Sequence, residues 1–176
     1  MSPAASPYFM STARLGFRAW RPEDLALAVS LWGDADVMAL IDKRGGLTHD
    51  QVRERLELEM RHREEHGVQY WPFFLLDTDD FVGCAGLKVY PPEPGRFEMG
   101  FHLRRVSWGS GYATEAGKAV VRYAFEVLGL GSLLAGHNPA NHASRKVLEK
   151  LGFTHLRDEY FEGTGMVHPL YELRRG

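Results

Sequence analysis

The sequence predicts one domain of mixed α and β structure, and three observations support this prediction. Stretches with apolar residues at helical spacing alternate along the chain with short runs that have the composition and alternation of strands. Three strand patterns in succession between residues 70 and 104 indicate a meander, and the part that follows alternates helix and strand. A chain of 176 residues, 44% of them hydrophobic, buries roughly 70% of the surface exposed in its unfolded state, which is enough for a core.

The N-terminal part is expected to begin with a tail, a strand and a helix. Residues 1–13 show neither periodicity and are expected to form a mobile tail ahead of a single domain that spans residues 14–176. Residues 14–20 alternate apolar and polar side chains, as a strand does. Pro22 with two acidic neighbours then favours a helix that continues to about Trp32.

A second helix is expected between Thr48 and Gly67. Thr48 and Gln51 match the capping box that begins many helices, and apolar residues recur every fourth position from Val52. Gly67 is placed to end this helix.

The remaining elements follow from the same two periodicities. Strands are expected at residues 70–76, 81–90, 96–104, 133–136, 153–160 and 167–174, and helices at residues 112–127 and 141–151. Gly152 would end the second of these helices. Cys84, between two small residues, is expected to be a buried strand residue and not a nucleophile.

Composition and charge narrow the classes of partner. The formal net charge is −2, so no strong overall field draws the chain to nucleic acid or to an anionic membrane. No apolar stretch approaches the length of a membrane span, and the N-terminus lacks the pattern of a secretory signal. A single cysteine cannot form an internal disulfide, which indicates a reducing compartment. We therefore expect a cytoplasmic protein that binds neither nucleic acid nor a membrane.

The stretch WGSGYATEA, residues 108–116, places two glycines at the start of a predicted helix. The first N–H groups of a helix have no intrahelical partner, and the helix dipole adds positive charge there. Gly109 and Gly111 would let an anion approach these groups, so the segment fits a phosphate-binding loop. A plain turn, in which the glycines only supply positive φ, fits the same residues. The segment is neither a dinucleotide-binding G-x-G-x-x-G pattern nor a Walker A loop.

Two segments together resemble the GNAT superfamily of acyl-CoA-dependent N-acyltransferases. WGSGYATEA is similar to the loop with which this superfamily binds the CoA pyrophosphate, and NPANHASRKVLEKLGF, residues 138–153, is similar to a second motif. The opening RLGFRAWRPEDL and the strand FEMGFHL are usual in the branch that includes the RimJ/RimL-type protein N-terminal acetyltransferases. The chain departs from the family at two positions. The first position of the loop pattern holds Trp108, and the place of a frequent tyrosine acid holds Leu148.

The resemblance implies a central, mostly antiparallel, twisted sheet of six to seven strands flanked by about four helices. It implies acetyl-CoA as the acyl donor, no metal, and a primary amine as acceptor, on a protein N-terminus or on a small molecule. A homodimer would be compatible with it. The residues implied to bind the donor are Phe101, His102, Leu103, Trp108, Gly109, Ser110, Gly111, Tyr112, Ala113, Thr114, Asn138, Asn141, Ser144 and Lys146.

Direct transfer in a ternary complex needs a group that accepts a proton, because an alkylammonium with a pKa of about 10 is not a nucleophile. The resemblance gives this role to Glu98, and the alternative is a strand carboxylate with a salt-bridge partner. His102 is a second candidate for the base. A backbone N–H of Gly100, Phe101 or His102 would stabilise the charge on the carbonyl oxygen. Ser144 would donate a hydrogen bond to the thiolate, or it would bond the local backbone.

Two other functions compete with an N-acetyltransferase. The stretch HREEH, residues 62–66, matches the zinc-peptidase pattern H-x-x-E-H, but no partner motif supplies a third ligand, so a solvated helix face is expected. A CoA-binding module without useful catalysis would keep the loop and lose the chemistry. Glu98 beside an open groove would distinguish the enzyme from this module. Contacts to the acceptor are expected from residues 41–47 and 90–96.

Overall fold

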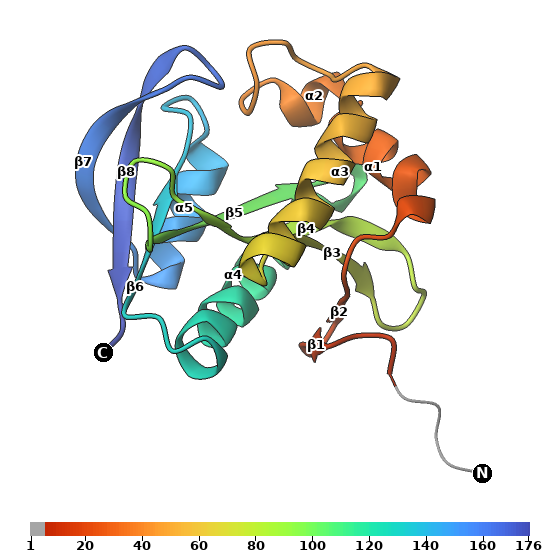
Figure 1. The fold of residues 1–176 in the computed structure, drawn as a ribbon, viewed down its shortest axis with the longest axis horizontal. Helices are drawn as coiled ribbons and strands as arrows, with labels where there is room; N and C mark the ends of the chain where they lie inside the picture. Colours follow the sequence, from red (N-terminus) through yellow and green to blue (C-terminus); the bar gives the residue numbers. More distant parts are fainter. Residues whose placement is uncertain (1–5) are drawn as a thin grey trace.

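The structure is a computed structural model that describes residues 6–176, and it contains an open sheet with helices on both faces (Figure 1). The strands are β1 (Met10–Ser11), β2 (Leu15–Phe17), β3 (Tyr70–Leu75), β4 (Phe81–Val89), β5 (Phe97–Leu103), β6 (Ser132–Gly136), β7 (Thr154–Phe161) and β8 (Met166–Arg174). The helices are α1 (Leu25–Trp32), α2 (Ala35–Met38), α3 (His49–His66), α4 (Tyr112–Arg122) and α5 (His142–Leu151). Short 3₁₀ turns at Pro22–Asp24 and Arg105–Ser107 precede α1 and α4.

The strands lie in the order β1-β2-β3-β4-β5-β6-β8-β7. All neighbouring strands are antiparallel except β5 and β6, which run parallel. β5 pairs with β4 along its whole length, but it pairs with β6 only at Glu98 and Leu134. The two parallel strands therefore separate beyond Glu98, and the gap between them positions the site.

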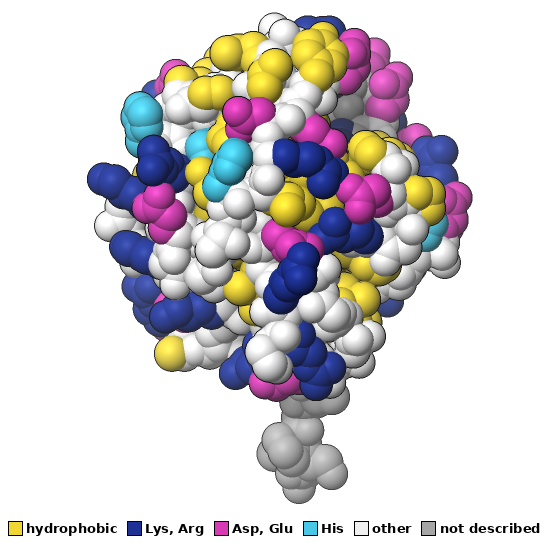
Figure 2. Space-filling model, turned by 90° about the vertical axis from the view of Figure 1, so that its left-hand side faces the viewer, with side chains coloured by type: hydrophobic (Ala, Val, Ile, Leu, Met, Phe, Trp, Pro, Cys, Tyr) yellow, Lys and Arg dark blue, Asp and Glu magenta, His cyan; other side chains and the backbone are white. Residues whose placement is uncertain are grey.

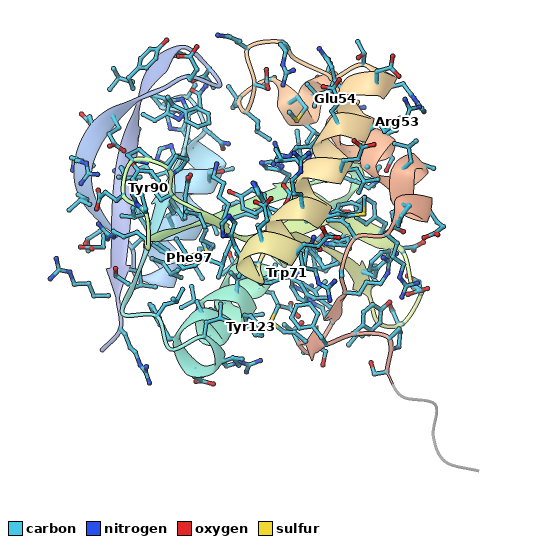
Figure 3. All side chains as sticks on the ribbon, viewed as in Figure 1. Arg53, Glu54, Trp71, Tyr90, Phe97 and Tyr123 are labelled. Carbon is cyan, nitrogen blue, oxygen red and sulfur yellow. The ribbon has the colours of Figure 1, made fainter. Side chains whose placement is uncertain are left out.

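The helices cover the two faces of the sheet because the side chains of each strand alternate between those faces. α1, α2 and α3 pack over a cluster that includes Tyr70, Phe74 and Cys84, and Cys84 is fully buried, as the sequence predicts. α4 and α5 pack over the opposite cluster, which includes Trp71. Figure 3 shows Trp71 and Tyr123 on this second face, and their rings lie 5.4 Å apart.

The predicted helix signals occur in the structure. The hydroxyl of Thr48 accepts a hydrogen bond from the N–H of Gln51 at 3.3 Å, and the Gln51 side chain accepts one from the N–H of Thr48 at 2.9 Å. Gly67 and Gly152 end α3 and α5 with φ of 73° and 90°, a backbone conformation that favours glycine. Within residues 6–176, no helix has both the length and the apolar character needed to cross a bilayer.

The N-terminal boundary differs from the prediction. Residues 1–5 of the expected tail lie outside the described residues, but Met10 and Ser11 form β1 and pair with Phe17 and Gly16 of β2. β1 brings the sheet to eight strands, one more than the upper end of the prediction. Two residues are too few to show an alternating pattern, so the sequence gives no sign of this strand.

Two helical features were also not predicted correctly. α2 is one short turn that begins after Asp34, whose side chain accepts a hydrogen bond from the N–H of Asp36 at 2.8 Å.

After α4 the helix widens at Tyr123–Val127 into a π-type turn, in which the N–H of Leu128 bonds the carbonyl of Tyr123 at 3.0 Å. The extra residue in this turn changes the helical phase. Val127 is therefore 65% exposed, although its spacing predicts a buried position.

Candidate active site

A cavity of about 540 Å³ opens where β5 and β6 separate. Its wall also includes residues of α3, of the loop after β4, of the start of α5 and of the β7–β8 hairpin. The predicted site residues that line it are Glu98, Phe101, His102, Asn138, Asn141 and Ser144. Leu103, Lys146 and the loop 108–114 do not line it. Apart from Leu103 and Lys146, the predicted site residues therefore form two groups, one that lines this cavity and one in the loop 108–114.

The hydrogen-bond pattern of β5 decides which backbone N–H faces this cavity. Antiparallel partners alternate between residues that bond each other and residues whose polar groups point outward. The N–H of Arg104 bonds the carbonyl of Val82 at 2.9 Å, so the even-numbered residues of β5 bond β4. The N–H groups of Gly100 and His102 are therefore used in the sheet, and that of Phe101 points into the gap. Of the three predicted oxyanion donors, Phe101 has the required direction.

The side chain of Glu98 lies on the face of β5 that α3 covers. Glu98 and His102 share this face with Gly100 between them, because side chains alternate along a strand. A Cβ atom at Gly100 would overlap the hydroxyl of Tyr70, so glycine lets this hydroxyl approach the strand. Lys88 lies opposite Glu98 on β4, with its Nζ 3.4 Å from the carboxylate. Glu98 thus has the salt-bridge partner expected of a structural carboxylate and also faces the cavity.

The imidazole of His102 is uncharged near neutral pH. The indole N–H of Trp32 donates a hydrogen bond to Nδ1 of His102 at 3.1 Å, so Nδ1 is the acceptor of a neutral ring. Burial, with a smaller contribution from the nearby cations of Arg55 and Lys88, lowers the pKa of His102 from 6.5 to about 3. A ring of this low pKa holds a proton only weakly, which argues against the second candidate base, and the neutral side chain forms part of the cavity wall.

The start of α5 brings one hydroxyl to the cavity. Asn141 caps the helix, because its side-chain oxygen accepts a hydrogen bond from the N–H of Ser144 at 3.0 Å. The hydroxyl of Ser144 makes no hydrogen bond to another residue in the described range, so it is available to a ligand. Leu148 follows one turn later, is 1% exposed and supplies no acid. Asn138 is buried and shapes the approach to α5 with a hydrogen bond to the N–H of Ala140 at 3.0 Å.

The loop ahead of α4 has the geometry of an anion site. Gly109 and Gly111 have φ of 76° and 79°, and no atom lies within 4 Å of a Cβ built at Gly109. Between Gly109 and Thr114 no backbone N–H bonds another residue of the described part of the chain, and no side chain caps the helix. These groups match the oxygen acceptors of a pyrophosphate. Both glycines therefore supply positive φ, and Gly109 also leaves open space beside the backbone, whereas a Cβ at Gly111 would lie 3.6 Å from Nη2 of Arg14.

Arg14 holds this loop from outside. Its Nη1 donates a hydrogen bond to the carbonyl of Ser110 at 3.1 Å, and its Nε donates one to Glu115 of α4 at 2.7 Å. The guanidinium also lies 4.5 Å from the centre of the Tyr112 ring. Thr12 adds a hydrogen bond from its hydroxyl to Glu115 at 2.6 Å. Thr12, which was expected to lie in a mobile tail, is thus bound to the first turn of α4.

Trp108 and Lys146 were predicted to bind acetyl-CoA, and the structure gives little support for either contact. Trp108 is 51% exposed, and its indole N–H donates a hydrogen bond to the carbonyl of Leu103 at 3.0 Å. Lys146 is exposed on α5 and lies outside the cavity wall. Their contacts to a donor stay predictions.

The two histidines of the HREEH segment lie on α3, and no third metal ligand joins them among the described residues. The rings of His62 and His66 are 6.3 Å apart, and the nearest ion pair of His66 is with its neighbour Glu65 at 3.7 Å. Among residues 6–176, no three His, Cys, Asp or Glu side chains are placed to share a metal ion.

Three side chains of the cavity were not found from the sequence. Arg55 of α3, Tyr70 of β3 and Lys88 of β4 line it together with Glu98. Each lies within a predicted helix or strand, and nothing in one sequence shows which neighbouring element it faces. Tyr90 begins the segment 90–96, which was expected to contact the acceptor. It lines the cavity from the end opposite α3 and donates a hydrogen bond to Glu159 of β7 (Figure 3).

The sequence and the fold have counterparts among known proteins. Residues 14–154 match the family model described as "Acetyltransferase (GNAT) domain". "Uncharacterized N-acetyltransferase p20" of Bacillus licheniformis is 29% identical over 163 residues, which cover 91% of each chain. "FsC-acetyl coenzyme A-N(2)-transacetylase" of Aspergillus fumigatus is 44% identical over 155 residues, which cover 84% of this chain and 65% of that protein.

Solved structures show the same fold. An acetyltransferase of the GNAT family from Bacillus anthracis superposes with a TM-score of 0.80 at 24% identity, over 94% of this chain and 97% of that one. RimL, a "Ribosomal L7/L12 alpha-N-protein acetyltransferase" solved in complex with CoA, gives a TM-score of 0.76 at 15% identity, over 93% and 95% of the two chains.

Proposed function

The chain belongs to the GNAT acetyltransferase family and is an acetyl-CoA-dependent N-acetyltransferase, and from this premise we propose how its substrates meet. The pyrophosphate of the donor binds the N–H groups of the loop 109–114. Its acyl end enters the gap between β5 and β6, and a primary amine enters from the side of α3. The amine attacks directly in a ternary complex, without a covalent enzyme intermediate.

One observation carries this proposal. Glu98, Phe101 and Ser144 all line one cavity, the N–H of Phe101 points away from β4, and the hydroxyl of Ser144 bonds no other described residue. The amine nitrogen forms a bond to the acetyl carbon, and the C–S bond breaks. The proton of the amine passes to Glu98, directly or through water, and the N–H of Phe101 stabilises the charge on the carbonyl oxygen. The hydroxyl of Ser144 donates to the leaving thiolate, whose ordinary pKa of about 8.5 makes modest help sufficient.

The names of two related proteins bear on the class of acceptor. RimL is named for a protein α-amine, and the Aspergillus relative is named for an N(2) nitrogen, so both support transfer to nitrogen. We propose a primary amine on a protein N-terminus or a small molecule, with a RimJ/RimL-like arrangement of the donor loop. A cytoplasmic location, a homodimer and the absence of a nucleic-acid partner stay predictions.

The open cavity beside Glu98 supports catalysis over a module that only binds CoA. The direct test is a mass-resolved acetylation screen, in which purified protein and acetyl-CoA meet a panel of peptide N-termini and small amines. We expect an increase of 42 mass units, one acetyl group for one hydrogen, on a nitrogen of at least one class. Acetyl-CoA binding without transfer to any amine, with an active acetyltransferase as control, would contradict the proposal.

A further inference from the structure

The wall of the cavity on the α3 side includes charged side chains that have no role in the proposed amine transfer. Four charged side chains lie around Tyr70: Arg55, Glu59, Lys88 and Glu98. Arg55 and Lys88 each lie 5.9 Å from the centre of the Tyr70 ring. Glu98 is the proposed base and pairs with Lys88 at 3.4 Å. Arg55 and its partner have no role in the chemistry described above.

Arg55 is held in one position. Its Nε donates a hydrogen bond to Glu59 at 3.1 Å, and its Nη2 lies 3.0 Å from the same oxygen. Glu59 is 2% exposed and is fixed by the N–H of Tyr70 at 2.8 Å. The guanidinium also lies 5.1 Å from the centre of a Trp32 ring. A guanidinium held in this way loses little further entropy when it binds a ligand.

The other edge of this guanidinium faces the cavity. The side chain of Arg55 is 26% exposed and lines the cavity wall, and its Nη1 bonds no other residue between positions 6 and 176. Arginine donates two parallel hydrogen bonds to a carboxylate, and charged hydrogen bonds of this kind are among the stronger ones. The position therefore offers a preformed site for a planar anion.

We propose that the acceptor is a small molecule that carries a carboxylate within a few bonds of its amine, and that Arg55 binds this carboxylate. The inference rests on the proposed function, because it places the acceptor in the cavity beside Glu98. Arg55 is then a residue that determines acceptor specificity, and Glu59 positions it.

The test uses pairs of acceptors that differ only by a carboxylate. The pairs are L-phenylalanine with 2-phenylethylamine, L-lysine with cadaverine, and L-histidine with histamine, and kcat/KM is measured for each at saturating acetyl-CoA. We expect at least one amino acid to exceed its decarboxylated partner by roughly tenfold to a hundredfold, the usual effect of a charged hydrogen bond. Arg55→Met should remove this preference through KM, and Arg55→Lys should restore only part of it.

Two controls keep the test decisive. Arg61→Met removes an exposed arginine from the same helix and should leave the preference unchanged. Because Arg55→Met leaves a buried Glu59 without its partner, the double variant Arg55→Met/Glu59→Met is made as well. Acetyl-CoA affinity, followed by its effect on thermal unfolding, should be the same in all of these variants.

Three results would overturn the inference. The first is equal kcat/KM for both members of every pair, and the second is an equal loss for both members in Arg55→Met. The third is acetylation of none of the amino acids. Acetylation of the decarboxylated amines or of peptides in these cases would leave the proposed N-acetyltransferase function standing.

Discussion

The residue with the largest expected effect on rate is Glu98. Glu98→Gln keeps the shape of the side chain and removes the base, so kcat/KM for the amine should fall by about 10²- to 10⁴-fold. The loss should shrink as pH rises, because more of the acceptor is then neutral without help. Profiles of kcat/KM from about pH 6 to pH 10 check this, since this range spans the pKa of typical amines.

The matched control is Glu126→Gln, which neutralises an exposed carboxylate after α4. Acetyl-CoA affinity should be unchanged in both variants, because Glu98 lies on the acceptor side of the cavity. Parallel profiles with Glu98→Gln within about threefold of the parent would remove Glu98 from the mechanism. The proton acceptor would then have to be sought at His102 or in a chain of water molecules.

The neutral state of His102 makes the protein less stable in mild acid. The folded-state pKa of about 3 lies below the ordinary value of 6.5, so the unfolded chain binds a proton that the folded chain does not. The free energy of unfolding should therefore fall as pH drops from 6.5 toward 3, by at most about 1.4 kcal/mol per pH unit from this one group.

Urea unfolding of the parent and of His102→Gln between pH 5 and pH 7.5 measures this contribution. Glutamine can still accept the hydrogen bond from Trp32 but cannot titrate, so the variant should show the shallower pH dependence. Burial also lowers the pKa of His62 and His168, so only the difference between the two proteins reports on His102. Identical slopes would mean that His102 takes up its proton as readily in the folded protein.

At the scale of elements, the turn before α4 combines strained backbone with open space. Valine at Gly111 must adopt a φ of 79°, and valine at Gly129 a φ of 67°, and each should cost about 1–3 kcal/mol of stability. Gly129 lies after α4, and a Cβ built there has no atom of a non-neighbouring residue within 4 Å, so Gly129→Val is the control for strain alone. Only Gly111→Val should also weaken CoA binding, by about tenfold or more. Equal CoA affinity in both folded variants would make Gly111 a turn residue only.

The contact of Arg14 with this turn should control the direction of one N–H. A trans peptide points its carbonyl and its N–H in opposite directions. Because Arg14 bonds the carbonyl of Ser110 on the outside, the N–H of Gly111 is held toward the open side of the loop. Arg14→Met should therefore raise KM for acetyl-CoA by about tenfold with little change in kcat. Arg122→Met, at the far end of α4, is the control, and a fall in kcat at unchanged KM would contradict this role.

The elements differ in how far the sequence predicts them. The capping box of α3 and the glycines at the ends of α3 and α5 were predicted because local residues determine helix ends. β1 and α2 were not, since their few residues show no period. For the site, Glu98, Ser144 and the glycines of the loop follow from motifs. Arg55 and Lys88 face the cavity only through the packing of α3 and β4 against β5, which is a property of tertiary structure.

At the scale of the whole molecule, one face shows why the net charge of −2 conveys little about partners. Figure 2 shows that acidic and basic side chains are interspersed on the face that carries β7 and β8. Much of this charge is paired across strands and loops: Arg96 bonds Glu93 and Glu172, and Arg157 bonds Glu93 and Glu159. Recognition therefore depends on the local charges of the cavity and of the loop before α4.

The donor should stabilise the whole fold, because its proposed site needs elements that are far apart in the sequence. The loop 109–114, the gap between β5 and β6 and the start of α5 come together only in the folded chain, so acetyl-CoA should not bind the unfolded state. At a concentration about a hundred times Kd the gain is roughly 2.7 kcal/mol, which raises Tm by about 5–10 °C for a chain of this length. Thermal unfolding with and without millimolar acetyl-CoA measures this shift. Gly111→Val should lose most of it while Glu98→Gln keeps it, and a parent protein without any shift would remove the donor from this site.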